Sequence, residues 1–168
     1  MITNTSTLRP VVRRILTEDY VPVAEIARSL HPQWFTESAL LDIARDIQTQ
    51  DAYVALEKKV IGFATFVLTG NSNVAELTWI GVSPELHRRG VGRALVTAIE
   101  NDLAQREVQA LQVSTLAPTV EYEPYARTRD FYHALGFSDV QIDENWFPSG
   151  DDRLLLSKRI DRGIRSLR

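Results

Sequence analysis

The first third of the chain carries a short strand pattern followed by two helical patterns. We expect a strand over Val11–Leu16, where β-branched residues are mixed with two arginines. A helix should follow and end at His31-Pro32, because proline breaks the interior of a helix. Thr36 is a suitable N-cap for a second helix. The apolar positions at helical spacing are Val23, Ile26, Ala27 and Leu30 in the first helix, and Leu40, Ile43, Ala44 and Ile47 in the second.

The middle of the chain changes to the pattern of β-strands. Three strands are expected over Ala52–Glu57, Val60–Thr69 and Val74–Val82, and the short turns between them predict an antiparallel meander. Helical spacing returns at Gly90 and runs to Leu103. A short strand of the buried type is then expected over Ala110–Thr115.

The last third is predicted to hold one helix and two closing strands. The helix covers Thr128–Leu135 and stops at Gly136, a suitable C-cap. The strands cover Phe137–Ile142 and Arg153–Arg159. Leu116–Arg127 shows no clear period and reads as a long loop, a length at which loops are often functional. The expected order is βααβββαβαββ, an α/β chain of the α+β type.

Composition narrows the classes of function. The 168 residues suggest a single domain over residues 1–160, followed by a basic tail over residues 161–168. The net charge of −3 does not favour nucleic-acid binding. The chain has no cysteine, which excludes disulfides, thiolate metal sites and cysteine nucleophiles. We find neither a signal peptide nor an apolar run of membrane-spanning length, so we expect a cytoplasmic protein without a membrane partner.

The segment around Gly90 has the chemistry of an anion site. A helix that begins at Gly90-Val91-Gly92 has unpaired N–H groups at its start, and the missing side chains let a ligand approach them. The helix dipole and three arginines, Arg88, Arg89 and Arg93, add positive charge. An ordinary turn with solvated arginines is the plain alternative. A Walker loop is excluded because no lysine follows the second glycine, and a dinucleotide loop because Leu95 stands at the third glycine position.

Two motifs resemble the GCN5-related N-acetyltransferase (GNAT) superfamily. The run Val82-Ser83-Pro84, then His87-Arg88-Arg89-Gly90-Val91-Gly92, is similar to motif A of that family, Gln/Arg-x-x-Gly-x-Gly/Ala after a strand ending in Val-x-Pro. His87 departs from the usual Gln or Arg, at a position that contacts phosphate largely through its backbone. The run Phe131-Tyr132-His133-Ala134-Leu135-Gly136-Phe137 is similar to the signature Phe-Tyr-x-x-x-Gly-Phe near the end of the family fold.

The resemblance implies a fold and a reaction. It implies a mixed, mostly antiparallel, V-split sheet with flanking helices, which acetyl-CoA enters between the strands Val74–Val82 and Ala110–Thr115. The implied reaction is acetyl transfer from acetyl-CoA to a primary amine by direct attack, with no covalent enzyme intermediate and no metal. The three histidines are scattered and give no metal-ligand spacing. The candidate cofactor-binding residues are Ile80, Gly81, Val82, His87, Arg88, Arg89, Gly90, Val91, Gly92, Arg93 and Arg129.

Two candidate catalytic residues follow from matching the family positions. Glu76 is the ionisable side chain of an otherwise apolar strand and matches a glutamate that acts as general base in many members; an exposed strand glutamate is the alternative. Tyr132 matches the tyrosine that protonates the leaving thiolate; a buried aromatic packed on Phe131, Leu135 and Phe137 is the alternative. Arg129 could approach a phosphate or the pantetheine arm, but an exposed helix arginine is favoured over that role. Gly81 fits close backbone approach by the cofactor, or a bulge that only bends the strand.

The acceptor is expected to be a small-molecule or peptide amine. The resemblance implies substrate walls from the first helix pair and the later loops, and aromatic and acidic groups there would suit a cation. These candidates are His31, Trp34 and Phe35, Glu121–Tyr125, and Asp143–Trp146. Other readings are another acyl-CoA donor, a non-catalytic acyl-CoA sensor or scaffold, and an unrelated nucleotide-phosphate module. A homodimer is left open.

Overall fold

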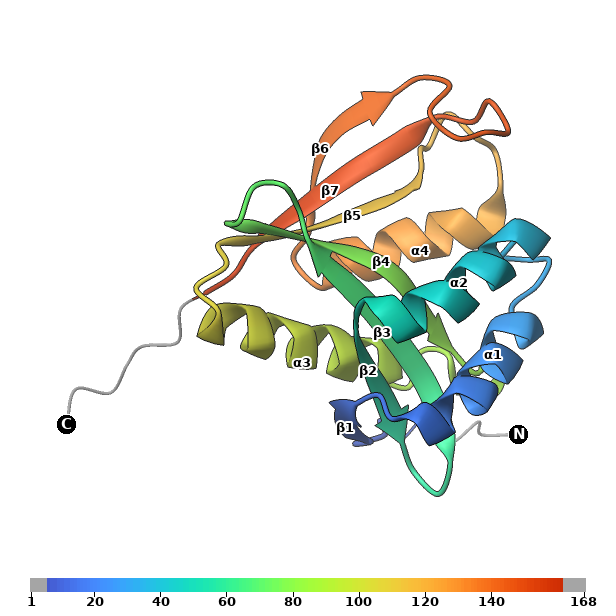
Figure 1. Ribbon diagram of the computed structural model, residues 1–168. Helices are drawn as coiled ribbons and strands as arrows, with labels where there is room; N and C mark the ends of the chain where they lie inside the picture. Colours follow the sequence, from blue (N-terminus) through green and yellow to red (C-terminus); the bar gives the residue numbers. More distant parts are fainter. Residues whose placement is uncertain (1–5, 162–168) are drawn as a thin grey trace. The chain divides into compact units, whose positions relative to one another are not determined.

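The structure is a computed structural model that describes residues 6–161 (Figure 1). Its elements follow the predicted order βααβββαβαββ, with 3₁₀ turns added at Thr17–Asp19 and Pro84–Leu86. The expected basic tail lies outside the described residues from position 162 onward. The helices and strands are β1 (Val11–Arg14), α1 (Tyr20–Ser29), α2 (Glu37–Thr49), β2 (Asp51–Leu56), β3 (Val60–Leu68), β4 (Val74–Val82), α3 (Val91–Gln105), β5 (Ala110–Leu116), α4 (Glu123–Ala134), β6 (Ser138–Asp143) and β7 (Arg153–Arg159).

The seven strands form a sheet with the order β1-β2-β3-β4-β5-β7-β6. The pairs β1–β2, β2–β3, β5–β7 and β6–β7 are antiparallel, whereas β4 and β5 run parallel, with Val74–Leu77 opposite Ala110–Val113. The predicted mixed, mostly antiparallel sheet is therefore confirmed. The chain divides into two compact units, one of residues up to Phe66 with Trp79–Ile99, and the other of Val67–Thr78 with the residues from Glu100 on.

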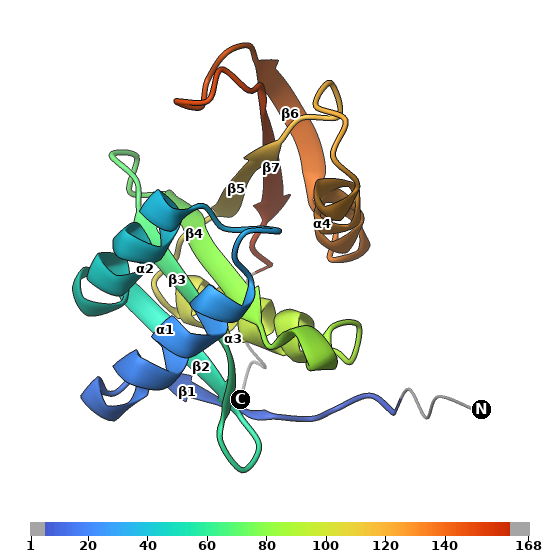
Figure 2. The same ribbon diagram turned by 90° about the vertical axis from the view of Figure 1, so that its right-hand side faces the viewer.

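The first unit has its core between the helices α1 and α2 and one face of the strands β2 and β3 (Figure 2). Val23 of α1, Ile43 of α2 and Phe63 of β3 are each 0% exposed. The Thr36 hydroxyl accepts a hydrogen bond from the Ala39 N–H at 3.1 Å, which confirms the predicted N-cap. The strand β1 ends at Arg14 and not at Leu16. Its continuation is lost because the Leu16 N–H donates to the Asp19 carboxylate at 2.8 Å.

Two glycines on neighbouring strands let the helices approach this part of the sheet. A Cβ on Gly62 of β3 would lie 3.1 Å from Val91 Cγ1 and 3.2 Å from Leu95 Cδ1, so this glycine sets α3 close to the strand. A Cβ on Gly81 of β4 would lie 2.6 Å from the Phe63 ring, a distance that real Cβ atoms do not tolerate. Core packing thus explains Gly81, in addition to the two explanations considered from the sequence.

The second unit has α4 packed on β5 and the antiparallel strands β7 and β6 beyond it. The helix α4 begins at Glu123, so the expected long loop is wrong over its second half and the expected start at Thr128 is five residues late. Proline is well placed at the start of a helix, and Pro124 stands there. Glu123 and Arg127 add an ion pair at 2.6 Å between positions i and i+4.

The helix α4 ends in a Schellman motif, a standard helix C-cap. Gly136 has a φ of +92°, its N–H donates to His133, and the Phe137 N–H donates to the Tyr132 carbonyl at 3.1 Å. The rings of Tyr132 and Phe137 pack at 5.5 Å, which is the apolar contact that accompanies this cap. The predicted C-cap at Gly136 is confirmed.

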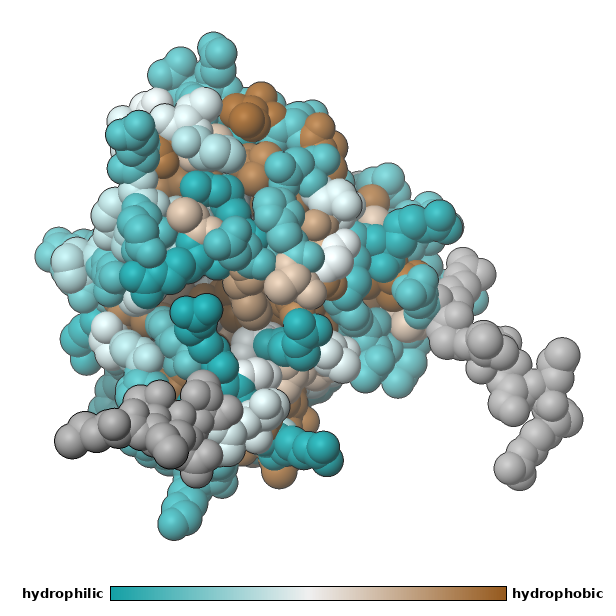
Figure 3. Space-filling model, turned by 180° about the vertical axis from the view of Figure 1, so that it is seen from behind, coloured by the Kyte–Doolittle hydropathy of each residue, from teal (hydrophilic) through white to brown (hydrophobic). Residues whose placement is uncertain are grey.

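Apolar side chains also reach the surface of the second unit. On β6 and the loop after it, Val140, Ile142 and Trp146 are 47–54% exposed. Figure 3 shows apolar groups among hydrophilic ones in the upper part of its view, at the height that β6 and β7 have in Figure 1. Single exposed apolar residues are ordinary on proteins.

Candidate functional site

The connection between β4 and α3 is a tight loop of the first unit. It continues the sheet ladder as far as Ser83, whose N–H donates to the Ile61 carbonyl at 2.9 Å. A 3₁₀ turn over Pro84–Leu86 follows, closed by the Leu86 N–H on the Ser83 carbonyl at 2.9 Å. The helix α3 then begins at Val91, and the Gly90 carbonyl accepts from the Ala94 N–H at 3.0 Å.

The backbone of this loop exposes a row of hydrogen-bond donors. Two residues have left-handed conformations, Arg88 with a φ of 62° and Gly90 with a φ of +87°. Within residues 6–161, the structure records no carbonyl that accepts from the N–H groups of residues 88–92. Successive free N–H groups at a helix start favour an anion, and the helix dipole adds to their effect. The geometry therefore has the properties that the sequence predicts for a phosphate site.

The side chain of His87 stabilises the loop through a hydrogen bond and a ring contact. Its Nε2 lies 2.8 Å from the carbonyl oxygen of Val82, and because a carbonyl can only accept, Nε2 carries the proton. Its ring packs edge-on against Trp34 at 5.2 Å. At the position where His87 departs from the family pattern, the side chain thus ties the loop to the end of β4.

The N-terminal segment fixes the loop from outside. The Leu8 N–H donates to the Arg89 carbonyl at 2.9 Å, and the Arg89 guanidinium donates weakly to Ser6, with distances of 3.3 and 3.4 Å to its carbonyl and hydroxyl oxygens. Arg88 and Arg93 are exposed. Arg89 therefore helps to hold the loop against the N-terminal segment.

Glu76 lies in the second unit, on the part of β4 that pairs with β5. It is half-buried and stands opposite Gln112. Among the described residues, no hydrogen bond or ion pair of its carboxylate is recorded. The side chain has the exposure that a proton acceptor needs, and the same exposure fits a plain strand glutamate.

Tyr132 also lies in the second unit, near the end of α4, and is 4% exposed. Its ring contacts Phe131 at 5.3 Å and Phe137 at 5.5 Å, as the packing alternative expects. Burial raises the pKa of the Tyr132 phenol, and the nearby Tyr125 raises it further. The phenol therefore keeps its proton at neutral pH and can act as a hydrogen-bond donor.

Two further polar side chains of this unit are Arg129 and Thr115. The Arg129 guanidinium donates to the Leu116 carbonyl at 2.9 Å, so it caps the end of β5 and is not simply solvated. The Thr115 hydroxyl of β5 is buried and has no hydrogen-bond partner in the described part of the chain. A buried hydroxyl without a partner is unfavourable unless a ligand group completes it. Sequence reasoning missed Thr115, because a threonine in a strand carries no functional signal.

The expected substrate walls are largely occupied by contacts of their own. Phe35 is buried, and Glu123 is paired with Arg127. The Arg153 guanidinium lies 3.5 Å above the centre of the Trp146 ring and donates to Asp143 at 2.9 Å. Glu123, Asp143 and Trp146, which were expected to suit a cationic amine, thus already contact arginines of this chain.

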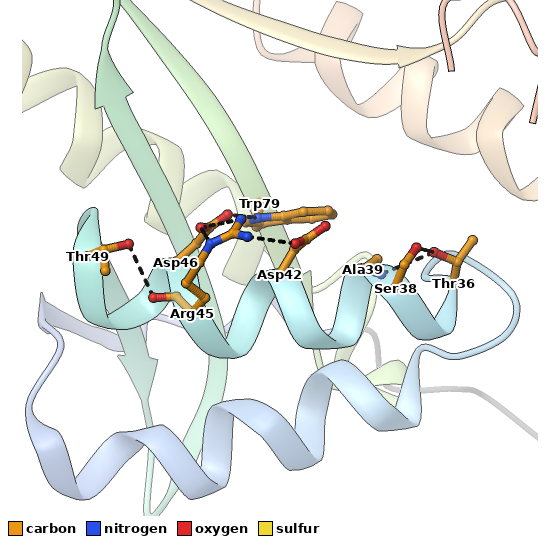
Figure 4. Close-up of polar contacts among 8 residues, drawn as sticks. All are labelled: Thr36, Ser38, Ala39, Asp42, Arg45, Asp46, Thr49 and Trp79. Atoms are coloured by element: carbon orange, nitrogen blue, oxygen red, sulfur yellow. Dashed lines mark hydrogen bonds and ion pairs between the residues drawn. The ribbon is translucent and has the colours of Figure 1, made fainter. Parts of the chain in front are cut away.

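An aromatic and acidic pair that sequence reasoning missed lies on α2 and β4 (Figure 4). The Trp79 indole Nε1–H donates to Asp46 at 2.7 Å, and Asp46 is 6% exposed. The sequence did not indicate Asp46, because helical spacing predicts only the apolar positions of α2. Two of the four expected there, Leu40 and Ala44, are only partly buried.

The described residues place no three His, Cys, Asp or Glu side chains together in a way that could hold a metal ion. No helix within residues 6–161 combines the length and the apolar character that a membrane span needs. The N–H groups of the loop in the first unit fit a ligand that carries phosphates, as acetyl-CoA does.

Comparison with known proteins assigns the chain to a family. The model of the Acetyltransferase (GNAT) family matches residues 12–137, and the chain belongs to this family. Its resemblance to GNAT motifs is thereby confirmed.

Among curated proteins, the [ribosomal protein bS18]-alanine N-acetyltransferase of Escherichia coli is 33% identical over 79 residues, 47% of this chain and 49% of that protein. The match thus spans about half the length of the relative. A GNAT-family protein of Desulfovibrio desulfuricans has a TM-score of 0.81 at 23% identity, over 91% of this chain and 100% of that one. The solved S18-alanine N-acetyltransferase of Escherichia coli has a TM-score of 0.72 at 22% identity, over 95% and 99%. These structures share the fold.

Proposed function

We propose that this chain is an acyl-CoA-dependent N-acetyltransferase, which moves an acetyl group from acetyl-CoA to a primary amine. The single observation that carries the proposal is the contiguous loop over Val82–Val91, with two left-handed residues and with the N–H groups of residues 88–92, for which residues 6–161 provide no recorded acceptor. Membership of the GNAT family supports the choice of acetyl-CoA as its ligand. The donors of residues 88–92 would hold the pyrophosphate, while Arg88 and Arg93 would add charge. His87 and Arg89 would keep the loop in shape.

Direct transfer gives each candidate residue a limited task. The amine nitrogen attacks the thioester carbon, the C–S bond breaks, and the proton lost by the nitrogen balances the thiolate that leaves. Glu76 would take that proton, directly or through water. Backbone groups of Ile80, Gly81 and Val82 would orient the cofactor arm and donate to the carbonyl oxygen. No enzyme nucleophile takes part, which agrees with a chain without cysteine.

Tyr132 would act on the sulfur by hydrogen bonding. Its raised pKa lies above that of an ordinary thiol, about 8.5, so complete transfer of the phenol proton to the thiolate would be uphill. A hydrogen bond from the neutral phenol to the thiolate involves a charged acceptor and would contribute about 1.5–3 kcal/mol. We therefore refine the role of Tyr132 from proton source to donor of a stabilising hydrogen bond. Arg129, engaged with Leu116, would support the end of β5 beside the cofactor arm.

For the acceptor, we propose an amine at the N-terminus of a peptide or on a small molecule. The curated relative carries in its name the alanine of ribosomal protein bS18, which supports a peptide amine as the first candidate. Neither nucleic acid nor a membrane is part of the proposal. We also propose a cytoplasmic location and a homodimer.

Release of free CoA tests the proposal directly. The purified chain would be incubated with acetyl-CoA and a panel of alanyl peptides, polyamines and simple amines. Since the chain has no cysteine, a thiol reagent reads CoA without background from the protein. We expect amine-dependent release on at least one acceptor. Tight acetyl-CoA binding without release on any amine would support a sensor or scaffold instead, and absence of binding would overturn the proposal.

A further inference from the structure

Asp46 is a buried carboxylate on the apolar face of α2. Its neighbours on that face, Ala39, Ile43 and Ile47, are buried apolar residues, and Asp46 itself is 6% exposed. Burying a carboxylate is costly unless hydrogen bonds compensate it, and a well-packed apolar residue in its place is often equally stable. The position therefore calls for an explanation beyond the stability of the fold.

The hydrogen bonds of Asp46 hold one aromatic side chain in a fixed orientation. Its Oδ2 accepts from the Trp79 indole at 2.7 Å, and its Oδ1 accepts from Arg45 at 2.9 Å. The ring of Phe35 meets the Trp79 ring edge-on, with 5.8 Å between centroids and 87° between planes. In Figure 4 the indole nitrogen points at Asp46, and the carbon end of the ring extends along α2 in the direction of Thr36.

Trp79 directly precedes the backbone proposed to bind the reacting thioester, Ile80–Val82. Its side chain is only half-buried, although its single polar atom is satisfied inside. The ring is thus a fixed apolar surface that keeps some exposure. The face of an indole attracts cations, and a negative partner on its N–H makes the ring more electron-rich.

We propose that Trp79 binds the cationic acceptor amine, and that Asp46 is the positioning residue that holds its indole in place. This inference rests on the proposed function, for which it names the acceptor-binding side chain. The amine in its ammonium form would lie against the indole face before it loses its proton. Arg45 completes the hydrogen bonding of Asp46 and also pairs with Asp42 at 3.0 Å.

Titration of the indole signals by nuclear magnetic resonance tests the binding step without turnover. The chain has three tryptophans, so three indole N–H signals are expected, and Trp79→Phe identifies one of them. The probe is an alanyl hexapeptide amide, added to the full chain in the presence of CoA. We expect the Trp79 signal to move in a saturable way, whereas the N-acetylated form of the same peptide leaves it in place. A Trp79 signal unmoved by the free amine overturns the proposal.

Kinetics on matched variants test the positioning role. Asp46→Leu removes the acceptor for the indole and should raise the KM for the amine about tenfold, with the acetyl-CoA Kd within twofold. Asp46→Asn keeps an oxygen for the indole and should restore the KM to within about threefold of the parent. Asp42→Asn is the control, because Asp42 lies on the same helix and pairs with the same arginine. If Asp46→Leu behaves like Asp42→Asn, the positioning role is wrong.

The two proposals fail in different ways. A chain that turns over amines but shows equal KM values in the parent and in Trp79→Phe contradicts the role of Trp79 alone. A chain that releases no CoA with any amine contradicts the proposed function, and a saturable movement of the Trp79 signal would still support an amine site. Should Asp46→Leu not fold, Asp46→Asn and Trp79→Phe decide between these results by the same measurements.

Discussion

The loop before α3 and the end of α4 match two motifs of one family, yet they are built differently. In the loop, backbone conformation and the N–H groups of residues 88–92 carry the candidate chemistry, and the side chains of His87 and Arg89 mainly hold the chain in place. At the end of α4, Tyr132, Gly136 and Phe137 are the residues of a Schellman cap. The second motif is thus largely explained by how a helix stops. The Tyr132 hydroxyl group is the part of this motif that the cap does not explain, and it is the candidate functional group.

This contrast predicts that cofactor binding at the loop is sensitive to changes of backbone conformation. At the end of α4, by contrast, loss of a single hydroxyl group should affect the reaction. A branched residue at Gly90 gives the sharpest test. Gly90→Val should weaken acetyl-CoA binding roughly 100-fold, because the φ of +87° is strained for a β-branched residue and an added Cβ would lie 3.2 Å from Thr7. Isothermal titration calorimetry measures this Kd.

Gly150→Val supplies the matched control for Gly90→Val. Gly150 has a nearly equal φ of +85°, and an added Cβ there would meet nothing within 4 Å. Both variants carry similar backbone strain, and Gly90→Val adds the contact with Thr7, so thermal melts should show a loss of stability in both that is at least as large in Gly90→Val. Equal loss of acetyl-CoA affinity in the two would show that the loop conformation is not what binds the cofactor.

Removal of the Tyr132 hydroxyl tests the other side of the comparison. Tyr132→Phe keeps the ring contact with Phe137, and therefore the cap, while it deletes the proposed hydrogen bond to the sulfur. We expect kcat to fall about 50-fold, the size of one hydrogen bond to a charged group, with the acetyl-CoA Kd within twofold. Tyr53→Phe, on β2, controls for loss of a phenol elsewhere. An unchanged kcat would leave Tyr132 with a packing role only.

Glu76→Gln should lower kcat about 20-fold and leave acetyl-CoA affinity unchanged, because the amide keeps the shape of the side chain but takes no proton. CoA-release kinetics measure kcat, and calorimetry measures the acetyl-CoA Kd. An unchanged kcat in Glu76→Gln would assign Glu76 to the surface of the strand.

The arginines of the loop offer a smaller comparison within one region. Arg88→Ala should weaken CoA about tenfold more than it weakens 3′-dephospho-CoA if its exposed side chain meets that phosphate. Arg89→Ala should weaken both ligands equally, since Arg89 contacts Ser6 and shapes the loop. The four affinities are measured by calorimetry at one salt concentration, because exposed charges are screened.

A charge pair outside both regions should affect stability and leave the chemistry intact. Hydrogen bonds from Arg13 hold the pKa of Asp19 below its ordinary value, and the Leu16 N–H adds to this effect. The folded pKa is the lower one, so this stabilisation is present above about pH 4 and is lost as the pH falls through the folded pKa. Asp19→Asn should lower stability at pH 7 by about 2 kcal/mol, and the difference from the parent should shrink in melts at pH 3.

The sequence predicted the order of elements and the position of the phosphate loop because both depend on local patterns. Helical spacing, helix caps and a helix start with glycines each depend on residues that lie a few positions apart, as at Thr36 and Gly136. The start of α4 was missed because α4 has no clear apolar period. Without that period, Pro124 suggests the end of a helix and not its first turn. Asp46 and Thr115 were missed for another reason. Their significance depends on partners distant in sequence, such as Trp79, or on having no partner at all.

The hydrogen bond from Leu8 to Arg89 gives the loop a built-in reporter. The Leu8 amide exchanges its hydrogen with solvent only when this bond opens, so its exchange rate follows the order of the loop even when no reaction takes place. Slower exchange of this one amide on addition of acetyl-CoA would register tightening of the loop from a position outside it. The exchange rate of the Leu8 amide would thereby report cofactor binding without an acceptor amine or a label.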